Sequence, residues 1–276
     1  KFYINGAWVD PATPNDFDVI DPSTEEKCVV ISLGGQADTD AAVAAAKAAF
    51  DGWSQTSKEE RIALLEKLLE IYNARQEEMA QAMSMEMGAP ISMSRTNQVG
   101  AGAWHLGGFI NAFRDFEFDS EYTKTEMTLK EPIGVVACIT PWNWPMNQIV
   151  LKAIPAIATG CTVVLKPSEI APLSGVLFAE FMDEAGFPKG VFNMLNGDGV
   201  GVGSQLSVHP DVDMVSFTGS SRAGILISKA AADSLKRVSL ELGGKGANII
   251  FADAGEKAMK YGANRCFRNS GQSCNA

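Results

Sequence analysis

Histidine is scarce in this chain of 276 residues, and its cysteines form no recognisable pairs. The two histidines, His105 and His209, have no cysteine or histidine at the spacing of a metal-binding motif. The five cysteines are an odd number, and none of them lies in a CxxC motif. We therefore expect no metal site, no histidine-based catalytic triad and no disulfides. Free thiols are typical of a reducing compartment, so we predict a cytoplasmic protein.

Positive charge and long apolar runs are also lacking. The chain has 23 Lys and Arg residues against 33 Asp and Glu, which gives a formal net charge of -10. This balance argues against a nucleic-acid partner, because binding to a phosphate backbone depends on clustered positive charge. No apolar run approaches the roughly 18 residues that cross a bilayer, so we expect no membrane partner. With 46% hydrophobic residues, the chain can bury a large core in one or two domains.

The first half of the chain is predicted to be mainly helical. Residues 2–9 are typical of a peripheral hairpin, because Asn5 and Gly6 tolerate the positive φ angles of a two-residue turn. Ser57 and Glu60 form a capping box at the start of a helix. Apolar periodicity predicts helices over residues 38–50, from Ser57 to the break at Gly88 and Pro90, and over residues 91–113. The polar residues 122–130 are predicted to form an exposed, extended ribbon.

From Gly134 onward, short β-branched runs alternate with helical stretches. Strands are predicted at residues 135–139, 162–165, 191–195, 214–217 and 238–240, and helices at residues 153–158, 173–185, 200–208 and 223–235. The strands are apolar throughout, as expected when crossover helices cover both faces of a parallel sheet. We therefore predict an α/β fold with a doubly wound, Rossmann-like parallel sheet.

Polar and glycine-rich segments follow four of these five strands. They cover Thr140 to Pro145, Lys166 to Glu169, Thr218 to Gly224 and Glu241 to Lys245. In open α/β sheets, ligands bind beyond the carboxyl ends of the strands. The four segments are therefore predicted to share one ligand-binding edge.

Two of the segments suit a dinucleotide. Gly219 and Gly224 have the spacing of a phosphate loop, but Ile225 and Leu226 follow where a Walker loop needs Lys and Ser or Thr. The remaining use is a helix N-terminus that meets a pyrophosphate, with Ser220 adding a hydroxyl. Lys166 and Glu169 are placed for an adenosine ribose, and a carboxylate there favours NAD over NADP. Taken alone, Lys166 to Glu169 is better explained as a solvated turn in which Ser168 caps a helix.

Three residues suggest chemistry, and each has a simpler alternative. Glu241 ends a strand at the predicted edge, where a carboxylate is costly unless it is paired or used, but a surface glutamate is the simple reading. Asn143 lies between two tryptophans and two prolines, and it either bonds its own loop or offers a fixed N–H donor. Cys274 follows Gly271, which permits a sharp turn, although an isolated cysteine is by default a small buried hydrophobe.

The ordered set of motifs resembles one family, the NAD(P)-dependent aldehyde dehydrogenases. The similar segments are PWNWP from Pro141 to Pro145, KPSE from Lys166 to Glu169, FTGS from Phe217 to Ser220 with Gly224, ELGGK from Glu241 to Lys245, and GQSC from Gly271 to Cys274. The resemblance covers essentially the whole chain. It also identifies the ribbon near residues 122–130 as similar to the oligomerisation arm of the family.

The resemblance implies a reaction and a set of roles. By resemblance, an aldehyde is oxidised to a carboxylic acid with NAD. Cys274 would be the nucleophile that forms a thiohemiacetal and then a thioester. Asn143 would stabilise the oxyanion, and Glu241 would activate the water that hydrolyses the thioester. The cofactor contacts implied are Thr140, Trp142, Lys166, Ser168, Glu169, Gly199, Gly203, Phe217, Gly219, Ser220, Ala223, Gly224 and Leu242. The partner is a small-molecule aldehyde, and the full-length enzyme is expected to be a homodimer or homotetramer.

The resemblance also implies domain boundaries. Residues 1–117 and 133–241 would form the NAD-binding domain, residues 118–132 the oligomerisation ribbon, and residues 242–276 the start of a second α/β, catalytic domain. Members of the family continue well beyond the cysteine, whereas this sequence ends two residues after Cys274. We therefore expect a fragment that by itself binds NAD weakly and does not turn over. A CoA-acylating relative and an inactive nucleotide-binding chain are the alternatives, and Glu241 in its motif argues against the first.

Overall fold

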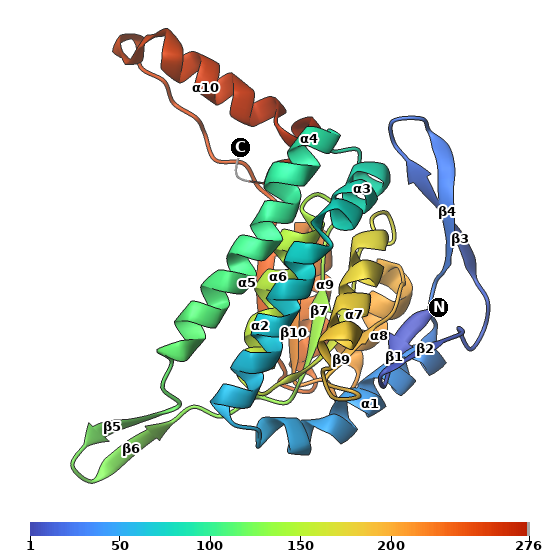
Figure 1. The fold of residues 1–276 in the computed structure, drawn as a ribbon, viewed down its shortest axis with the longest axis vertical. Coiled ribbons are helices and arrows are strands. Elements are labelled where there is room, and N and C mark those ends of the chain that lie inside the picture. Colours follow the sequence, from blue (N-terminus) through green and yellow to red (C-terminus); the bar gives the residue numbers. More distant parts are fainter. Residues whose placement is uncertain (275–276) are drawn as a thin grey trace.

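The computed structural model describes residues 1–274, and a mixed sheet forms its centre (Figure 1). Its seven strands run in the order β11-β10-β7-β8-β9-β1-β2. Strands β7 to β11 are parallel to one another, and β1 runs antiparallel to both of its neighbours, β9 and β2. The strands are β1 (Phe2–Ile4), β2 (Ala7–Val9), β7 (Val135–Ile139), β8 (Thr162–Lys166), β9 (Phe192–Met194), β10 (Met214–Gly219) and β11 (Arg237–Leu242). The predicted doubly wound, Rossmann-like α/β fold is confirmed.

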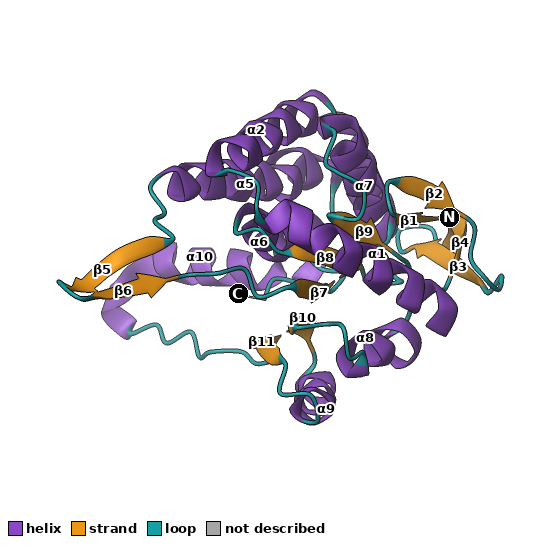
Figure 2. Cartoon of the chain, turned by 90° about the horizontal axis from the view of Figure 1, so that it is seen from below, coloured by secondary structure: helices purple, strands orange, loops and turns teal. Residues whose placement is uncertain are grey.

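Helices cover both faces of the sheet (Figure 2). On one face lie α2 (Lys58–Ala74), α3 (Gln76–Met87), α5 (Val99–Arg114), α6 (Pro145–Ala158) and α7 (Leu173–Ala185). On the other lie α1 (Gln36–Ser54), α8 (Ser204–Val208) and α9 (Ser221–Ala232). This two-sided cover explains why the parallel strands β7 to β9 are buried throughout and mainly apolar.

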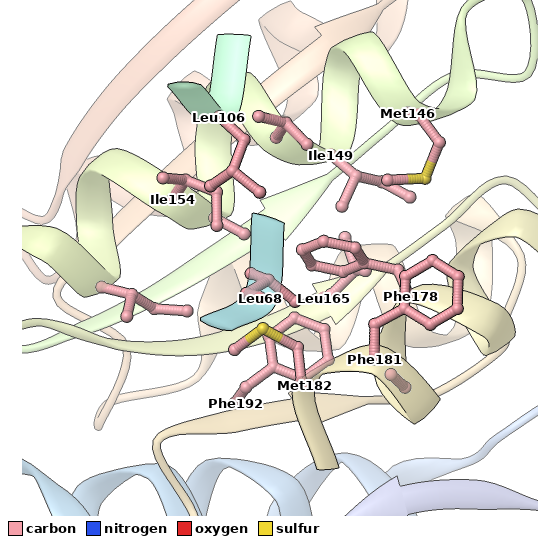
Figure 3. Close-up of a cluster of buried hydrophobic side chains, with 14 of the residues drawn as sticks. Leu68, Leu106, Met146, Ile149, Ile154, Leu165, Phe178, Phe181, Met182 and Phe192 are labelled. Carbon is pink, nitrogen blue, oxygen red and sulfur yellow. The ribbon is translucent and has the colours of Figure 1, made fainter. Parts of the chain in front are cut away.

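Strand β7 shows the division between the two faces residue by residue. Val136 and Cys138 belong to the core beneath α2, α5, α6 and α7, while Val135, Ala137 and Ile139 belong to the core beneath α1. Figure 3 shows part of the first core, where leucines, methionines and phenylalanines from several helices pack together with Leu165 of β8 and Phe192 of β9. All five residues of β7 are buried, so the strand anchors the loop that follows it.

The N-terminal hairpin was predicted to be peripheral, and this expectation is wrong. Strand β1 pairs with β9, with Tyr3 opposite Met194, and thereby extends the main sheet. Phe2, Tyr3 and Ile4 are all buried. The turn itself is as predicted, because Asn5 and Gly6 have φ angles of 54° and 70°.

The helical region differs from the prediction in its interruptions. The stretch after Ser57 breaks at Arg75 into α2 and α3, and Gly88 ends α3 with a φ of 73°. Residues 91–114 comprise α4 (Ile91–Met93), the π-helical turn η1 (Ser94–Gln98) and α5. Gly102 permits close packing there, since a Cβ atom would lie 2.3 Å from the Tyr72 hydroxyl. Gly102 therefore allows α5 to pack closely against Tyr72 of α2, and it does not mark a weak helix.

Two ribbons and a C-terminal helix lie outside the main sheet (Figure 1). Strands β5 (Asp119–Thr123) and β6 (Glu126–Leu129) form the exposed ribbon that was predicted, whereas the ribbon of β3 (Asp16–Asp21) and β4 (Glu26–Ser32) was not. The remaining elements are η2 (Gly199–Gly203), η3 (Ala252–Ala254), α10 (Gly255–Phe267) and η4 (Asn269–Gly271). Within residues 1–274, no helix combines the length and apolarity needed to cross a membrane.

Candidate functional site

The carboxyl ends of the parallel strands bring the predicted segments to one edge of the sheet. The register pairs Ile139 with Lys166 and Thr218 with Glu241. Strand β11 extends to Leu242, two residues beyond its predicted end, so Glu241 lies within the strand rather than after it. The loop after β7 leads from Thr140 into α6, whose first residue is Pro145.

Lys166 is a fully engaged cation at this edge. Only 3% of it is exposed, and its ammonium group donates to the carbonyls of Pro167 and Gly197 and to Glu169 Oε2 at 3.2 Å. Burial lowers the pKa of Lys166, and the charge of Glu169 opposes that shift. Ser168 Oγ accepts from the N–H of Ile170 at 3.3 Å. Ser168 therefore supports a turn, and the alternative in which it caps a helix is wrong because α7 begins only at Leu173.

The start of α9 offers free backbone donors beside Glu241. Ser220 caps the helix by accepting from the N–H of Ala223 at 3.2 Å, and the first N–H groups of a helix have no partner within it. A Cβ atom on Gly224 would lie 2.5 Å from Leu242 Cδ2, and one on Gly219 would lie 2.5 Å from Phe217 Cζ. Both glycines therefore permit close packing where the chain turns from β10 into α9. Such a helix N-terminus fits a pyrophosphate group.

The other predicted cofactor residues surround this edge in different ways. Gly203 packs on Lys166, because a Cβ atom there would lie 4.0 Å from Lys166 Cδ, while Gly199 is exposed at the start of η2. Phe217 is buried in the core, and Ala223 is half-buried. Leu242 is 43% exposed. Contact of these residues with a cofactor stays a prediction.

Asn143 is held from two sides. Its side-chain Nδ2 donates to the carbonyl of Gln272 at 2.8 Å, and its own carbonyl accepts from Gln98 Nε2 at 3.0 Å and from Asn269 Nδ2 at 2.8 Å. Trp142 supports the same contact, since its Nε1 donates to Gln272 Oε1 at 2.9 Å. The Asn143 side chain therefore bonds to the cysteine-bearing segment and not to its own loop.

Cys274 lies at the end of a strained turn. Asn269, Ser270 and Gly271 have φ angles of 56°, 55° and 74°, a run of left-handed conformations that only glycine adopts without cost. The carbonyl of Cys274 accepts from Lys245 Nζ at 3.4 Å, which links the cysteine to the segment that begins at Glu241. Cys274 is exposed, so the alternative of a small buried hydrophobe is wrong.

Glu241 lies on β11, at the carboxyl edge of the sheet. Its side chain is exposed, so the argument that burial would make this carboxylate costly does not hold. Lys152, on α6, is 8% exposed, and burial lowers the pKa of Lys152 while the charges of Cys138 and Glu241 oppose the shift. Glu241 therefore lies within electrostatic reach of the helix that follows Asn143.

Gln98 and Asn269 are contacts that the sequence did not reveal. Asn269 lies beside the recognised GQSC segment, which gave a weak signal, but Gln98 lies in a helical stretch with no motif. No group of three His, Cys, Asp or Glu side chains within residues 1–274 could hold a metal ion. The site consists of amides, one exposed thiol, one exposed carboxylate and a buried lysine. The doubly wound sheet with a free helix N-terminus at its carboxyl edge defines an α/β protein of the nucleotide-binding class.

Comparison with known proteins places the chain within that class. The sequence model of the aldehyde dehydrogenase family matches residues 8–276, and the chain belongs to this family. It is 52% identical to 3-succinoylsemialdehyde-pyridine dehydrogenase of a Pseudomonas species, covering 100% of this chain and 58% of the relative. The chain thus spans somewhat more than half the length of the curated relatives that it matches.

Solved structures agree closely with the fold. The aldehyde dehydrogenase of Bartonella henselae is 59% identical with a TM-score of 0.98, over 100% of this chain and 59% of that one. Aldehyde dehydrogenase C of Pseudomonas syringae, a cysteine-to-alanine mutant in complex with NAD+ and octanal, is 50% identical with a TM-score of 0.97. The match covers 99% of this chain and 56% of that one.

Proposed function

We propose that this chain carries the dinucleotide site and the nucleophile of an enzyme that oxidises an aldehyde to a carboxylic acid. The observation that carries the proposal is the hydrogen bond from Asn143 Nδ2 to the carbonyl of Gln272, two residues before Cys274. It holds a neutral amide donor against the segment that carries the exposed thiol. Nucleophilic attack on a carbonyl needs these two groups together, because the oxygen gains negative charge as the new bond forms.

The cofactor is NAD, and the residues present fit it. The N-terminus of α9 with Ser220 and Gly219 would take the pyrophosphate, and Glu169 and Lys166 the adenosine ribose. Bound NAD+ accepts a hydride from the substrate carbon. The relative from Pseudomonas syringae has been crystallised in complex with NAD+, which supports a nicotinamide dinucleotide here. Glu169 favours NAD over NADP because a carboxylate repels a 2′-phosphate.

The acylation half-reaction uses Cys274 and Asn143. The thiolate sulfur of Cys274 attacks the aldehyde carbon, a C–S bond forms, and the carbonyl π electrons move to oxygen. Gln272 is the only acceptor of the Asn143 amide within the described part of the chain, so its second N–H remains to stabilise that oxyanion. When the substrate C–H bond breaks with loss of hydride, the carbonyl re-forms and a thioester remains on Cys274.

The deacylation half-reaction uses Glu241. Its exposed carboxylate takes a proton from a water molecule while the water oxygen attacks the thioester carbon. The C–S bond then breaks, the acid leaves, and the Cys274 thiolate is restored. A CoA-acylating enzyme would pass the acyl group to a thiol instead, and such an enzyme would not need this carboxylate.

The proposal extends to the organisation of the protein. Residues 1–117 and 133–241 form the NAD-binding domain, the exposed ribbon at residues 118–132 is an oligomerisation arm, and residues 242–276 begin the catalytic domain. The partner is a small-molecule aldehyde, the assembly is a homodimer or homotetramer, and the location is cytoplasmic. The relatives that bind octanal or are named for a pyridine semialdehyde support the aldehyde class.

Stopped-flow measurement of NADH tests the proposal in a protein continued to the length of the relatives. Cys274→Ser is expected to abolish NADH formation, whereas Cys266→Ser, at another exposed cysteine, leaves it unchanged. Glu241→Gln is expected to keep a burst of one NADH per site and to slow later turnovers about 100-fold, because only deacylation needs the base. Glu256→Gln, in the exposed part of α10, is the matched control.

The outcomes separate the alternatives. Turnover by Glu241→Gln at the parental rate would remove Glu241 from the mechanism. Turnover that requires added CoA would favour the acylating alternative, and NAD binding without any Cys274-dependent burst would favour a non-catalytic nucleotide-binding chain.

A further inference from the structure

Two buried amides next to the site have no part in the reaction as proposed. Gln98 and Asn269 are 0% and 1% exposed. Gln98 Nε2 donates to Asn269 Oδ1 at 2.7 Å, and both side chains donate to the carbonyl of Asn143, at 3.0 Å and 2.8 Å. Three residues that are distant in the sequence therefore form a closed triangle of hydrogen bonds, which we call the amide triangle.

Gln98 occupies this place at a cost. Its Oε1 is buried and has no hydrogen-bond partner among residues 1–274, which disfavours a glutamine unless its donors are needed. The acceptors around Nε2 are Asn143 O, Asn269 Oδ1 and, at 3.4 Å, Met87 Sδ. Gln98 also ends the π-helical turn η1, an irregular turn that often occurs at functional sites. Apart from the long contact with Met87 Sδ, the amide is thus directed at the triangle.

Asn269 connects the triangle to the nucleophile. It begins the left-handed turn at residues 269–271, and a non-glycine residue holds such a conformation only when its surroundings compensate. Its side chain supplies that compensation through the bonds to Gln98 and Asn143. After the turn, the carbonyl of Gln272 meets the Asn143 side chain, and Cys274 follows two residues later. Asn143 is therefore held by its main chain and by its side chain at once.

We propose that Gln98 and Asn269 are positioning residues that fix the Cys274 thiol relative to the Asn143 amide. The proposal rests on the proposed function, because it presupposes that these two groups act on the same substrate atom. Neither residue touches substrate or cofactor. Their effect comes from geometry, since displacement of a reacting group by about 1 Å can cost 100-fold in rate.

Two substitutions remove the triangle in different ways. Gln98→Leu keeps a buried side chain of similar size without donors. Asn269→Gly removes the amide but keeps the left-handed backbone, because glycine adopts positive φ freely. Ser270→Gly is the matched control, since it gives the same turn a glycine and removes only the bond from Ser270 Oγ to the carbonyl of Gly88 at 3.0 Å.

The experiment measures the NADH burst by stopped flow in the protein continued to the length of the relatives. For Gln98→Leu and Asn269→Gly, the burst rate constant at saturating aldehyde is expected to fall about 10- to 100-fold. Two other quantities are expected to stay within about twofold of the parent. They are the aldehyde concentration that gives the half-maximal burst rate, and the dissociation constant of NAD, which protein fluorescence measures. Ser270→Gly keeps the parental burst rate. In an Asn143→Ala background, the further loss caused by Gln98→Leu becomes smaller, because one of the two positioned groups is already gone.

Several results would overturn this proposal. Parental burst rates in both variants would show that the triangle does not position the thiol, as would an equal loss in Ser270→Gly. Weakened NAD binding in step with the rate would indicate a general structural role. If Gln98→Leu does not fold, Asn269→Gly alone decides the question. A parent without a Cys274-dependent burst would refute the proposed function itself, whereas a normal burst with unaffected variants refutes only the positioning role.

Discussion

In the proposed function, Glu169 is the residue that most directly sets which dinucleotide the site accepts. It pairs with Lys166 at 3.2 Å, yet its side chain is still 27% exposed, so an oxygen remains available to a ribose hydroxyl. Glu169→Gln is expected to lower the preference for NAD over NADP about tenfold, because the repulsion of a 2′-phosphate is lost. The measurement is the ratio of kcat/KM for the two cofactors. Glu180→Gln, which removes a surface carboxylate beside Arg75, serves as the control. An unchanged ratio of kcat/KM for NAD and NADP in Glu169→Gln would mean that the ribose binds elsewhere.

Single residues also show where sequence reasoning reaches its limit in the site. Cys274, Asn143 and Glu241 could be singled out because each lies in a recognisable motif or at a predicted strand end. Gln98 could not, because its role depends on a π-helical turn and on two partners 45 and 171 residues away along the chain. The expected cost of a carboxylate at Glu241 does not apply, since β11 is an exposed edge strand among the described residues.

At the scale of elements, α7 depends on a carboxylate supplied by another helix. Pro172 precedes α7 and offers no capping side chain, and Glu86 on α3 accepts from the N–H groups of Leu173 and Ser174 instead. Glu86 is 0% exposed, and burial raises its pKa to about 7, although the bonds from α7 oppose the shift. The joint between α3 and α7 therefore titrates near neutral pH.

The raised pKa of Glu86 predicts how stability changes with pH. Between its ordinary value of 4.5 and about 7, the folded protein binds more protons at this group than the unfolded chain, so stability falls as pH rises. From pH 5 to pH 8, we expect the free energy of unfolding of the parent to fall by about 2 to 3 kcal/mol relative to Glu86→Gln, which cannot ionise. Urea unfolding at both pH values measures the difference. Glu70→Gln, at an exposed position of α2, controls for the loss of a carboxylate. If the free energies of unfolding of the parent and of Glu86→Gln differ by the same amount at pH 5 and at pH 8, the prediction is contradicted.

The elements themselves were predicted unevenly, for identifiable physical reasons. The parallel strands were found because burial on both faces leaves short uninterrupted apolar runs, as in Val135 to Ile139. The ribbon β3–β4 was missed because charged residues interrupt it, with Val19 as the only residue of β3 that is buried. Helix α10 was given no bounds in the sequence analysis because its sequence is largely polar, with small residues such as Gly262 on its less polar side, and it buries almost nothing.

For the whole molecule, the apolar residues left exposed after β11 are the most consequential surface. Phe251 and Phe267 are 73% and 78% exposed. Phe251 precedes α10 and Phe267 is its last residue, and α10 projects from the body in Figure 1. Strand β11 has a free edge among the described residues. Exposed apolar surface and an unpaired strand edge each promote association.

We therefore expect residues 1–276, expressed alone, to self-associate as concentration rises. Size-exclusion chromatography with light scattering should show a mass above 29.4 kDa, and the double variant Phe251→Ser/Phe267→Ser should shift it towards the monomer. Leu235→Ser is the control, because Leu235 is 89% exposed but lies in the turn before β11. A monomer at all concentrations in the unsubstituted chain would refute this expectation.

The pairing of β1 with β9 has a consequence for synthesis on the ribosome. The N–H of Asn5 bonds to Asn193 Oδ1, a residue 188 positions later. At roughly 5–20 residues per second, the first strand waits on the order of ten to forty seconds for its partner to be made. During that interval Phe2, Tyr3 and Ile4, all buried in the finished fold, can pair only with β2 and lack the neighbour on their other side. This segment of the nascent chain therefore stays accessible to chaperones that act during translation until β9 has been made.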